Sequence, residues 1–391
     1  MRVALVTNFY PPIQTGSSNW ARELAKAHLA AGDEVVVVTA GRGEAVGSAP
    51  EDGVLVYRLP SFFTLPRLHF FLNFNQFHLM ASPTNRQRLR AILRDHRVEI
   101  IHQSNHLLDS MFLSLRAARD LDIPAVCTIH SQISHSTSRL YDILMRSVDR
   151  GALRLAMNRF DCIIPLDATM AAYVRGTYRP RDMELLPVSC LTTAEVDALV
   201  PATPGDVDPE GVVRIASVGH VTENRNRVEL IRALPALVKA GVHPRLEIAG
   251  KVLSQTAPRL ADQLGVTANV RFCGEVRRAD LFNFLRPAHL ESHLFHLQGL
   301  GLATLEAMAM GLPVVCNAHE EIYGAVPLRH GENILFADPK NQSQVDEALL
   351  ALARDPGLRQ SMGQKARTLI KEHLVWDVVI NKFKQLYRRY L

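Results

Sequence analysis

The sequence has few cysteines and no long apolar run, and both absences narrow the class of protein. Its five cysteines in 391 residues show no spacing typical of a metal site or a disulfide framework. No uninterrupted apolar run of about 18 residues exists, so we expect no transmembrane helix. The first residues lack the apolar core of a signal peptide and lead directly into a strand-like run. These features predict a cytoplasmic enzyme.

The excess of positive over negative charge is also small. The formal net charge is +5 and the isoelectric point is near 9.0. Such a balance suits an anionic substrate or a membrane surface, and it equally suits a solvated surface with a slight basic bias. No long block of lysine and arginine argues for a nucleic-acid partner. Arginine outnumbers lysine and alanine is abundant, which is typical of a GC-rich bacterial genome.

Short apolar runs alternate with helical patterns along the whole chain, which is typical of parallel βαβ construction in an α/β fold. An amphipathic helix is expected over residues 20–31, and the chain reads as helical from about residue 342 to a final amphipathic segment, 376–391. The expected strands are 3–7, 34–39, 98–102, 125–129 and 162–165 in the first half, and 213–218, 245–249, 269–273, 288–295 and 313–316 in the second.

The two halves are of nearly equal size and predict two Rossmann-like domains, each large enough for its own core. Prolines and glycines between residues 201 and 211 interrupt the pattern, so we place a linker at 199–213. The predicted domains are residues 1–198 and 214–374, with a final helix over 375–391. Ligands of such sheets bind at the carboxyl ends of the strands.

The most informative stretch runs from Gln298 to Val315, where two alternating glycines open a helix-forming run that contains Glu306. Glycines let a backbone approach a ligand closely. The start of a helix presents free N–H groups and a positive dipole end. Glu306, expected to be buried in the first two turns, could accept hydrogen bonds from a ribose diol. The combination suits an anionic, hydroxyl-rich ligand such as a nucleotide sugar.

This stretch resembles the donor-site signature of the retaining glycosyltransferases of family 4, whose GT-B fold has two Rossmann-like domains facing a cleft. The usual pattern is Glu-Gly-Phe-Gly, Glu-Ala-Met-Ala and Gly-x-Pro-Val-Val. The match is complete from Glu306 to Val315, while Gln298 replaces the first glutamate and Leu294-Phe295 replaces the usual Pro-Ser. The resemblance implies that Gln298 lies by the reacting centre. It also implies that Gly299, Leu300 and Gly301 with Glu306 bind the donor, and that the last helix crosses back onto the first domain.

Two segments of the first half extend the resemblance. The loop Asn8–Ser18 is similar to the family's Tyr-Pro-Pro…Gly-Gly loop, which opens a helix toward the donor phosphates and the acceptor. Gly16 keeps one of the two glycines and Ser17 replaces the other, although Pro and Gly also mark plain βα turns. His130 follows the strand 125–129, where family members commonly place a histidine beside the transferred sugar, and an imidazole suits a hydrogen bond to a sugar hydroxyl.

Two segments of the second half complete the candidate site. The run Val218–Arg225 matches a family segment in which Arg and Lys clamp the leaving pyrophosphate, so Gly219 is assigned to the donor and His220 with Arg225 to the clamp. Cationic groups stabilise the charge that grows on a departing diphosphate. Arg227 fits a solvated basic loop. The run Phe272–Val276 resembles the base-pocket segment, in which backbone groups, here at Val276, would contact the nucleobase.

Three histidines raise the hypothesis of a metal site, because their spacing suits one face of a helix: His289, His293 and His296. The segment aligns instead with a strand that enters a loop, so we expect no metal site. The resemblance to GT-B enzymes, which characteristically need no bound metal, implies the same. Phenylalanines between residues 62 and 77 indicate either a membrane-touching or acceptor-binding excursion of the first domain, or a buried irregular segment.

The sequence therefore predicts a retaining glycosyltransferase that moves a sugar from a nucleotide-diphosphate sugar to an acceptor. The acceptor would be a small molecule or a lipid-linked or other glycan. The substitutions at Gln298 and His220 leave open a catalytically degenerate sugar-nucleotide-binding protein. A sugar phosphorylase on the same scaffold is a third interpretation. The sequence does not identify the base, the sugar or the acceptor.

Overall fold

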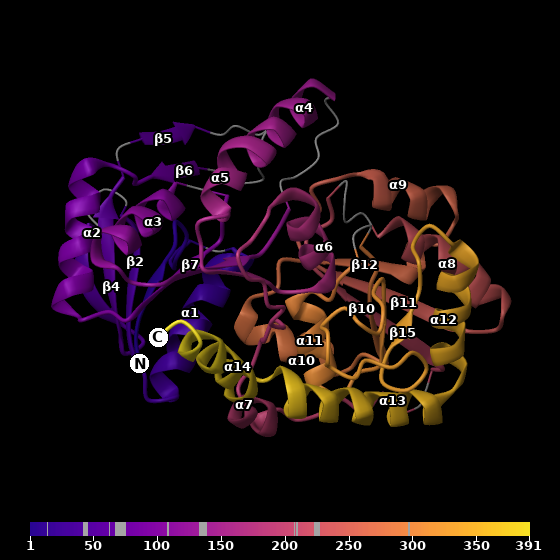
Figure 1. The fold of residues 1–391 in the computed structure, drawn as a ribbon. Helices are drawn as coiled ribbons and strands as arrows, with labels where there is room; N and C mark the ends of the chain where they lie inside the picture. The colour runs from indigo at the N-terminus through magenta and orange to yellow at the C-terminus, as the bar shows by residue number, and fades with distance from the viewer. Residues whose placement is uncertain are drawn as a thin grey trace. The chain divides into compact units, whose positions relative to one another are not determined.

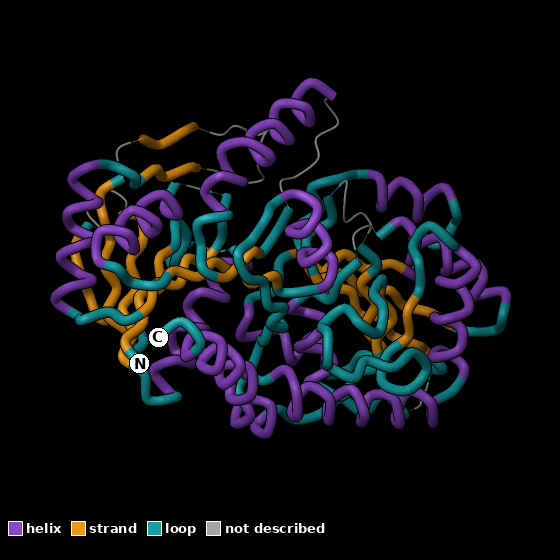
Figure 2. Tube along the Cα trace, in the orientation of Figure 1, coloured by secondary structure: helices purple, strands orange, loops and turns teal. Residues whose placement is uncertain are grey.

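The computed structural model of the chain describes residues 1–13, 15–41, 46–61, 63–66, 76–107, 109–132, 139–206, 208, 210–222, 227–295 and 298–391. The chain forms two compact units, Met1–Pro187 together with Val379–Leu391, and Val188–Val378. Each unit is a mainly parallel sheet with helices around it (Figures 1 and 2). The predicted α/β class with two Rossmann-like domains is confirmed.

The first unit is built on a sheet with the strand order β3-β4-β2-β1-β7-β8-β9, in which only β3 is antiparallel to its neighbour. Its central strands are buried along their whole length because helices cover both faces of a parallel sheet. The strands are β1 (Arg2–Val6), β2 (Glu34–Gly41), β3 (Gly47–Glu51), β4 (Val54–Pro60), β7 (Ile100–Ser104), β8 (Ala125–Ile129) and β9 (Cys162–Pro165), with a separate β5 (Phe63–Pro66) and β6 (Gln76–Leu79) pair.

Helices of the first unit pack on both faces of its sheet. One face of β1 and β2 packs with residues of α2 and α3 in a single core, for example Val6 with Leu89 and Met111. These helices lie together in Figure 1. The helices are α1 (Gly16–Ala30), α2 (Pro83–Asp95), α3 (Ser110–Leu121), α4 (Arg139–Val148), a π-helical turn at Asp149–Leu153, α5 (Arg154–Met157) and α6 (Ala168–Thr177).

The last helix, α14 (Trp376–Arg388), contributes its residues from Val379 onward to the first unit. The Tyr387 hydroxyl lies 2.5 Å from Nδ1 of buried His102 on β7. Phe383 contacts Trp20 of α1 edge to face, and Lys384 lies 3.1 Å from a carboxylate oxygen of Asp33. The end of the chain is therefore fixed to the first sheet by both packing and polar contacts.

The second unit is a six-stranded parallel sheet with the order β12-β11-β10-β13-β14-β15. Its strands are β10 (Val212–Val218), β11 (His243–Ala249), β12 (Val270–Gly274), β13 (Leu290–His293), β14 (Val314–Cys316) and β15 (Leu335–Phe336). Its helices are α7 (Thr193–Ala198), α8 (Val228–Lys239), α9 (Thr256–Gln263), α10 (Leu281–Leu285), α11 (Leu302–Ala309), α12 (Gln342–Arg354) and α13 (Pro356–Leu369), with 3₁₀ turns at Thr267–Asn269 and Arg278–Asp280 and a π-helical turn at Ile370–Leu374.

Most expected boundaries differ from the structure by one or two residues, and three of the differences are described here. The strand expected over 288–295 spans only Leu290–His293. The helix expected from residue 20 begins at Gly16, because the Thr15 side chain caps it by accepting a hydrogen bond from the Ser18 N–H. The second unit begins at Val188, ahead of the predicted linker at 199–213, because bonds such as Ala202 N–H to the Met310 carbonyl tie this segment to the second unit.

Two features expected from the sequence fall partly or wholly outside the described residues. Arg225 is one of them. The other is the phenylalanine-rich segment, of which Phe62, Phe70, Phe71 and Phe74 are not described, so both interpretations of it stay predictions. Within the described ranges, no helix is both long and apolar enough to cross a membrane.

Candidate active site

The carboxyl edge of the second sheet brings together most of the predicted donor residues. Because β10 to β14 are parallel, the segments that follow them emerge at one edge. Gly219 follows β10, Val276 comes shortly after β12, and the Gln298–Gly301 loop lies between β13 and α11. Val276 is half-buried and Gln298 is exposed. The predicted grouping of these segments follows from the sheet order.

Gly219 meets a second glycine, Gly250, at the ends of β10 and β11. The Gly219 N–H donates to the Ala249 carbonyl at 2.7 Å, and both glycines have positive φ, +130° and +153°. A Cβ atom on Gly250 would lie 2.2 Å from the Gly219 oxygen, which no side chain could tolerate. The sequence analysis identified Gly219 and missed Gly250, whose signal is its position directly after a strand.

His220 differs from the cation that its place in the motif suggests. Its Nδ1 accepts a hydrogen bond of 3.1 Å from the backbone N–H of Lys251, so in this arrangement that nitrogen acts as an acceptor. Lys251 Nζ lies 2.9 Å from Oε2 of Glu275, and this lysine holds the pKa of the Glu275 carboxyl below its usual range. Lys251 is therefore a cation beside His220 that sequence reasoning missed.

Arg227 is buried, which corrects its interpretation as part of a solvated loop. Only 2% of the residue is exposed, and it precedes α8 in a left-handed conformation with φ +63°. Its Nε donates to Ser217 Oγ at 2.7 Å, and its Nη2 donates to the carbonyls of Val218 and Gly219 at 3.2 and 3.3 Å. The guanidinium therefore supports the Gly219 loop from beneath.

The glycine loop before α11 is held by residues of the segment that follows β14. The Gly299 N–H donates to the Asn317 carbonyl at 2.9 Å, and Asn317 Nδ2 donates to the Phe295 carbonyl at 2.6 Å. The Tyr323 hydroxyl donates to the Leu300 carbonyl at 2.9 Å. Asn317 and Tyr323 were not identified from the sequence, because their role depends on contacts between segments distant along the chain.

Glu306 is buried on α11, as expected, and is paired with Arg278. The helix begins after Gly301, and Glu306 occupies its second turn with 2% of the residue exposed. Arg278 Nη1 lies 2.6 Å from Glu306 Oε1, and Arg278 Nη2 donates to the Cys190 carbonyl at 3.4 Å. Burial raises the pKa of the Glu306 carboxyl, and the Arg278 charge opposes this shift. Arg278 is a further site residue that the motif did not reveal.

The three histidines of the metal hypothesis do not share a helix. His293 is the last residue of β13, and His289 precedes the strand and accepts a hydrogen bond from the Arg214 N–H at 2.9 Å. His296 lies outside the described residues. Among the residues that the structure describes, no group of three or more histidine, cysteine or acidic side chains could hold a metal ion.

The first unit places His130 and Gly16 at the carboxyl edge of its own sheet. His130 follows β8, its Nε2 lies 3.2 Å from Ser104 Oγ, and its ring packs edge to face on Trp20. Burial lowers the pKa of His130 to about 3, so the imidazole is neutral near pH 7 and can hydrogen-bond a hydroxyl. Gly16 is exposed in the first turn of α1, and a Cβ atom there would meet nothing within 4 Å.

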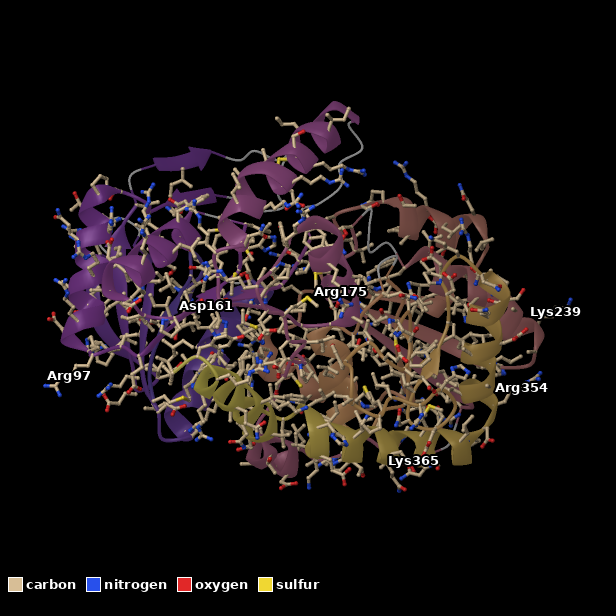
Figure 3. All side chains as sticks on the ribbon, in the orientation of Figure 1. Arg97, Asp161, Arg175, Lys239, Arg354 and Lys365 are labelled. Carbon is tan, nitrogen blue, oxygen red and sulfur yellow. The ribbon has the colours of Figure 1, made fainter. Side chains whose placement is uncertain are left out.

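A separate hollow of about 1000 Å³ lies at the opposite edge of the first sheet. It is lined by residues at the amino end of β8, such as Pro124 and Ala125, and by Asp161, which is labelled in Figure 3. Asp161 accepts a hydrogen bond from the Ala125 N–H at 2.9 Å. Because ligands of parallel sheets bind at the carboxyl ends, we place the site at the edge with His130 and not in this hollow.

Two family models match successive parts of the chain. The model described as Glycosyltransferase Family 4 matches residues 15–188, and the model described as Glycosyl transferases group 1 matches residues 207–369. The second match contains Gly219, Arg227, Glu306 and the whole glycine loop, and the first contains Gly16 and His130.

Known relatives and solved structures agree with these matches. The chain is 24% identical to a glycogen synthase of Mycobacterium tuberculosis, covering 99% of this chain and 94% of the relative. A GDP-mannose-dependent monoacylated alpha-(1-6)-phosphatidylinositol monomannoside mannosyltransferase of Corynebacterium glutamicum is 26% identical, but the match spans 47% of this chain and 51% of that relative.

In fold, the chain is similar to sucrose-phosphate synthase from Thermosynechococcus elongatus, with a TM-score of 0.77, 18% identity, and coverage of 99% of this chain and 98% of that one. It is also similar to HepE of Anabaena in complex with UDP-glucose, with a TM-score of 0.70, 14% identity and full coverage of both chains. From the two family models and the shared GT-B fold, the chain belongs to the family 4 glycosyltransferases.

Proposed function

We propose that the protein is a retaining glycosyltransferase that transfers a sugar from a nucleotide-diphosphate sugar held on its second unit. The observation that carries the proposal is the convergence of Gly219, the Gln298–Gly301 loop and buried Glu306 at one edge of the second sheet. The name of one neighbour adds support, because HepE of Anabaena was solved with UDP-glucose.

Each part of this edge has a role in the proposed reaction. The backbone at Gly219 and Gly301 receives the diphosphate, and Glu306 accepts hydrogen bonds from the ribose hydroxyls. Arg225 and His220 act on the leaving phosphate, Gln298 contacts the donor sugar, and backbone at Val276 contacts the base. The acceptor, a small molecule or a lipid-linked or other glycan, binds the first unit near His130.

Retention and independence from metal are part of the proposal. The leaving phosphate takes the proton of the acceptor hydroxyl, and the helix start with the cationic side chains neutralises the diphosphate. Turnover measured with and without EDTA tests the second point. The configuration of the new anomeric bond, determined by NMR of the product, tests the first.

A mass-spectrometric screen of nucleotide sugars for binding and turnover tests the function as a whole. A catalytically degenerate binding protein would bind a donor and neither hydrolyse nor transfer it. A sugar phosphorylase would need inorganic phosphate. Neither alternative is favoured by the relatives, which are named as synthases and transferases.

Cytoplasmic location with contact to a membrane surface completes the proposal. Apolar side chains are exposed on α4 and α5, with Ile143 at 60%, Leu144 at 55% and Leu155 at 68%. Arg146 and Arg150 are exposed beside them. Exposed apolar side chains with cations near them in sequence suit an anionic bilayer. Cosedimentation with anionic vesicles should weaken in Leu144→Ser and not in Val238→Ser, which alters an exposed apolar residue of the second unit.

A further inference from the structure

The centre of the second sheet contains a buried polar pair that the proposed reaction does not use. Glu291 and His293 alternate along β13, so both side chains are on one face of the strand, and they are 0% and 4% exposed. Nδ1 of His293 lies 3.8 Å from Oε1 of Glu291. Burying an acid in the middle of a sheet is costly, so its presence calls for an explanation.

The ring of His293 lies near both of the glycine segments that are assigned to the donor diphosphate. A Cβ atom on Gly219 would lie 3.6 Å from Cε1 of His293. A Cβ atom on Gly301 would lie 4.0 Å from Nε2 of the same ring. Arg227 Nη2 is nearer to the Gly219 position and Phe295 is nearer to the Gly301 position, but His293 is the side chain close to both, the segment after β10 and the segment before α11.

The polar and titratable groups around Glu291 come from its own strand and from three other elements. Arg227, at the start of α8, supports Gly219 and lowers the pKa of Glu291, and Thr304 of α11 acts in the same direction. Burial is stronger than both and raises the pKa of Glu291 to about 8. His293 lies on the same strand, and Cys316 on β14 is a buried thiol whose pKa is raised well above its usual value.

We propose that His293 is a positioning residue of the donor site, which sets the separation of the Gly219 and Gly301 segments, and that Glu291 beneath it couples diphosphate binding to protonation. The inference rests on the proposed function, because that function assigns the diphosphate to these segments.

The coupling has a definite sign. A negative charge on Glu291 repels a bound diphosphate, so a bound diphosphate favours the neutral carboxyl and raises its pKa further. Near pH 8 the free protein is partly ionised at Glu291 and the complex is not, so binding takes up a proton. Nucleotide affinity therefore falls as the pH rises through 8. The phosphate itself ionises at about pH 6 and does not contribute in this window.

Calorimetry with UDP, GDP and ADP at pH 7 and pH 9, in two buffers of different ionisation enthalpy, tests the proposal. The wild type should bind one of these probes more weakly at pH 9 and take up protons near pH 8. Glu291→Gln should abolish the proton uptake and flatten the pH profile. His293→Ala should weaken binding about tenfold or more, because misplaced binding groups lose affinity and rate.

The matched control is His289→Ala, which removes a buried imidazole at the amino end of the same strand. It should leave both the affinity and the pH profile unchanged. Should His293→Ala fold poorly, His293→Phe retains a ring of similar bulk without the nitrogens, and Glu291→Gln gives an independent reading. Wild-type affinity and proton uptake in folded His293→Ala and Glu291→Gln would overturn the proposal.

Failure of the donor assignment gives a different result. If the wild type binds none of the three nucleotides, the proposed function fails on those probes, while amide hydrogen exchange of the unliganded protein still tests the positioning role. His293→Ala should speed exchange at the amides of Gly219 and Gly301 relative to His289→Ala. Equal exchange in the two variants would overturn that role.

Discussion

Arg278 and Glu306 form an ion pair of 2.6 Å in which the acid is almost fully buried and the arginine side chain is 46% exposed. The pair lies at the point where the donor ribose is proposed to bind. The Glu306 carboxylate therefore has two partners. It pairs with Arg278 in the unliganded protein, and it is proposed to accept hydrogen bonds from the nucleotide.

Replacing Glu306 tests the proposed hydrogen bonds to the nucleotide. Glu306→Ala should weaken nucleotide binding by about 1.5–3 kcal/mol, because charge-assisted hydrogen bonds to the ribose are lost. Glu306→Gln keeps an acceptor oxygen and should have a smaller effect. Calorimetry with the nucleotide identified by the screen gives the affinities. Unchanged affinity in a folded Glu306→Ala protein would remove this residue from the site.

Replacing Arg278 tests the ion pair with Glu306. Arg278→Ala should lower the free energy of unfolding by about 1–3 kcal/mol near pH 7, because the buried carboxylate loses its counter-charge. The pKa of Glu306 is raised in the folded protein. Its ionisation therefore lowers the free energy of unfolding at pH values above the usual pKa of a glutamate. At lower pH, where the carboxyl is protonated in both the folded and the unfolded state, it has no such effect. The deficit of the variant should shrink toward acidic pH.

Urea unfolding of wild type and Arg278→Ala at pH 4 and pH 7 measures this difference. Arg277→Ala is the control, because Arg277 pairs with exposed Asp280 and not with a buried acid. A deficit that is the same at both pH values would show that the arginine acts through packing alone.

His220 and Arg225, the two residues assigned to the leaving phosphate, are expected to affect turnover in different ways. Because His220 Nδ1 accepts a hydrogen bond from the Lys251 N–H, we expect this residue to act on the phosphate by hydrogen bonding and not as a cation. His220→Asn, whose side-chain oxygen can accept the same bond, should keep the wild-type pH profile of turnover. Arg225→Ala should reduce turnover at saturating donor, because the lost charge matters most as the phosphate leaves.

The rate profile between pH 5.5 and pH 9 decides this point. A profile that loses an inflection in His220→Asn would show that the imidazolium contributes. Normal turnover of Arg225→Ala would remove that residue from the clamp.

The sequence predicted the elements that local patterns determine and missed the contacts that the fold creates. Strand β8 matches its expected bounds, 125–129, because a buried apolar run has clear limits. The burial of Arg227 was not predicted, since a lone arginine in a polar loop gives no sign that its head group meets Ser217 and Gly219. The Arg278–Glu306 pair joins two helical segments far apart in sequence, and no local pattern encodes it.

The docking of the last helix gives a prediction on stability. Tyr387→Phe removes the hydroxyl that lies 2.5 Å from Nδ1 of buried His102 and leaves the packing of the ring. The loss should lower the free energy of unfolding by about 1–2 kcal/mol, because a buried partner is left unpaired. Chemical denaturation measures the change. A Tyr387→Phe protein as stable as wild type would show that His102 finds another partner.

Gln298 is the sharpest test of how this protein differs from its family. A glutamine keeps an acceptor oxygen and adds an NH₂ donor, but it removes the negative charge that the family's glutamate places by the donor sugar. The residue is exposed at the start of the glycine loop, so replacing it should leave the fold intact. We expect that Gln298 suits an unusual donor sugar. Gln298→Glu should then lower turnover with the natural donor and raise it with common hexose donors. Steady-state rates across the nucleotide-sugar panel measure both changes. If the wild type is silent toward every donor and Gln298→Glu creates transfer, the site is a degenerate one that the single substitution repairs.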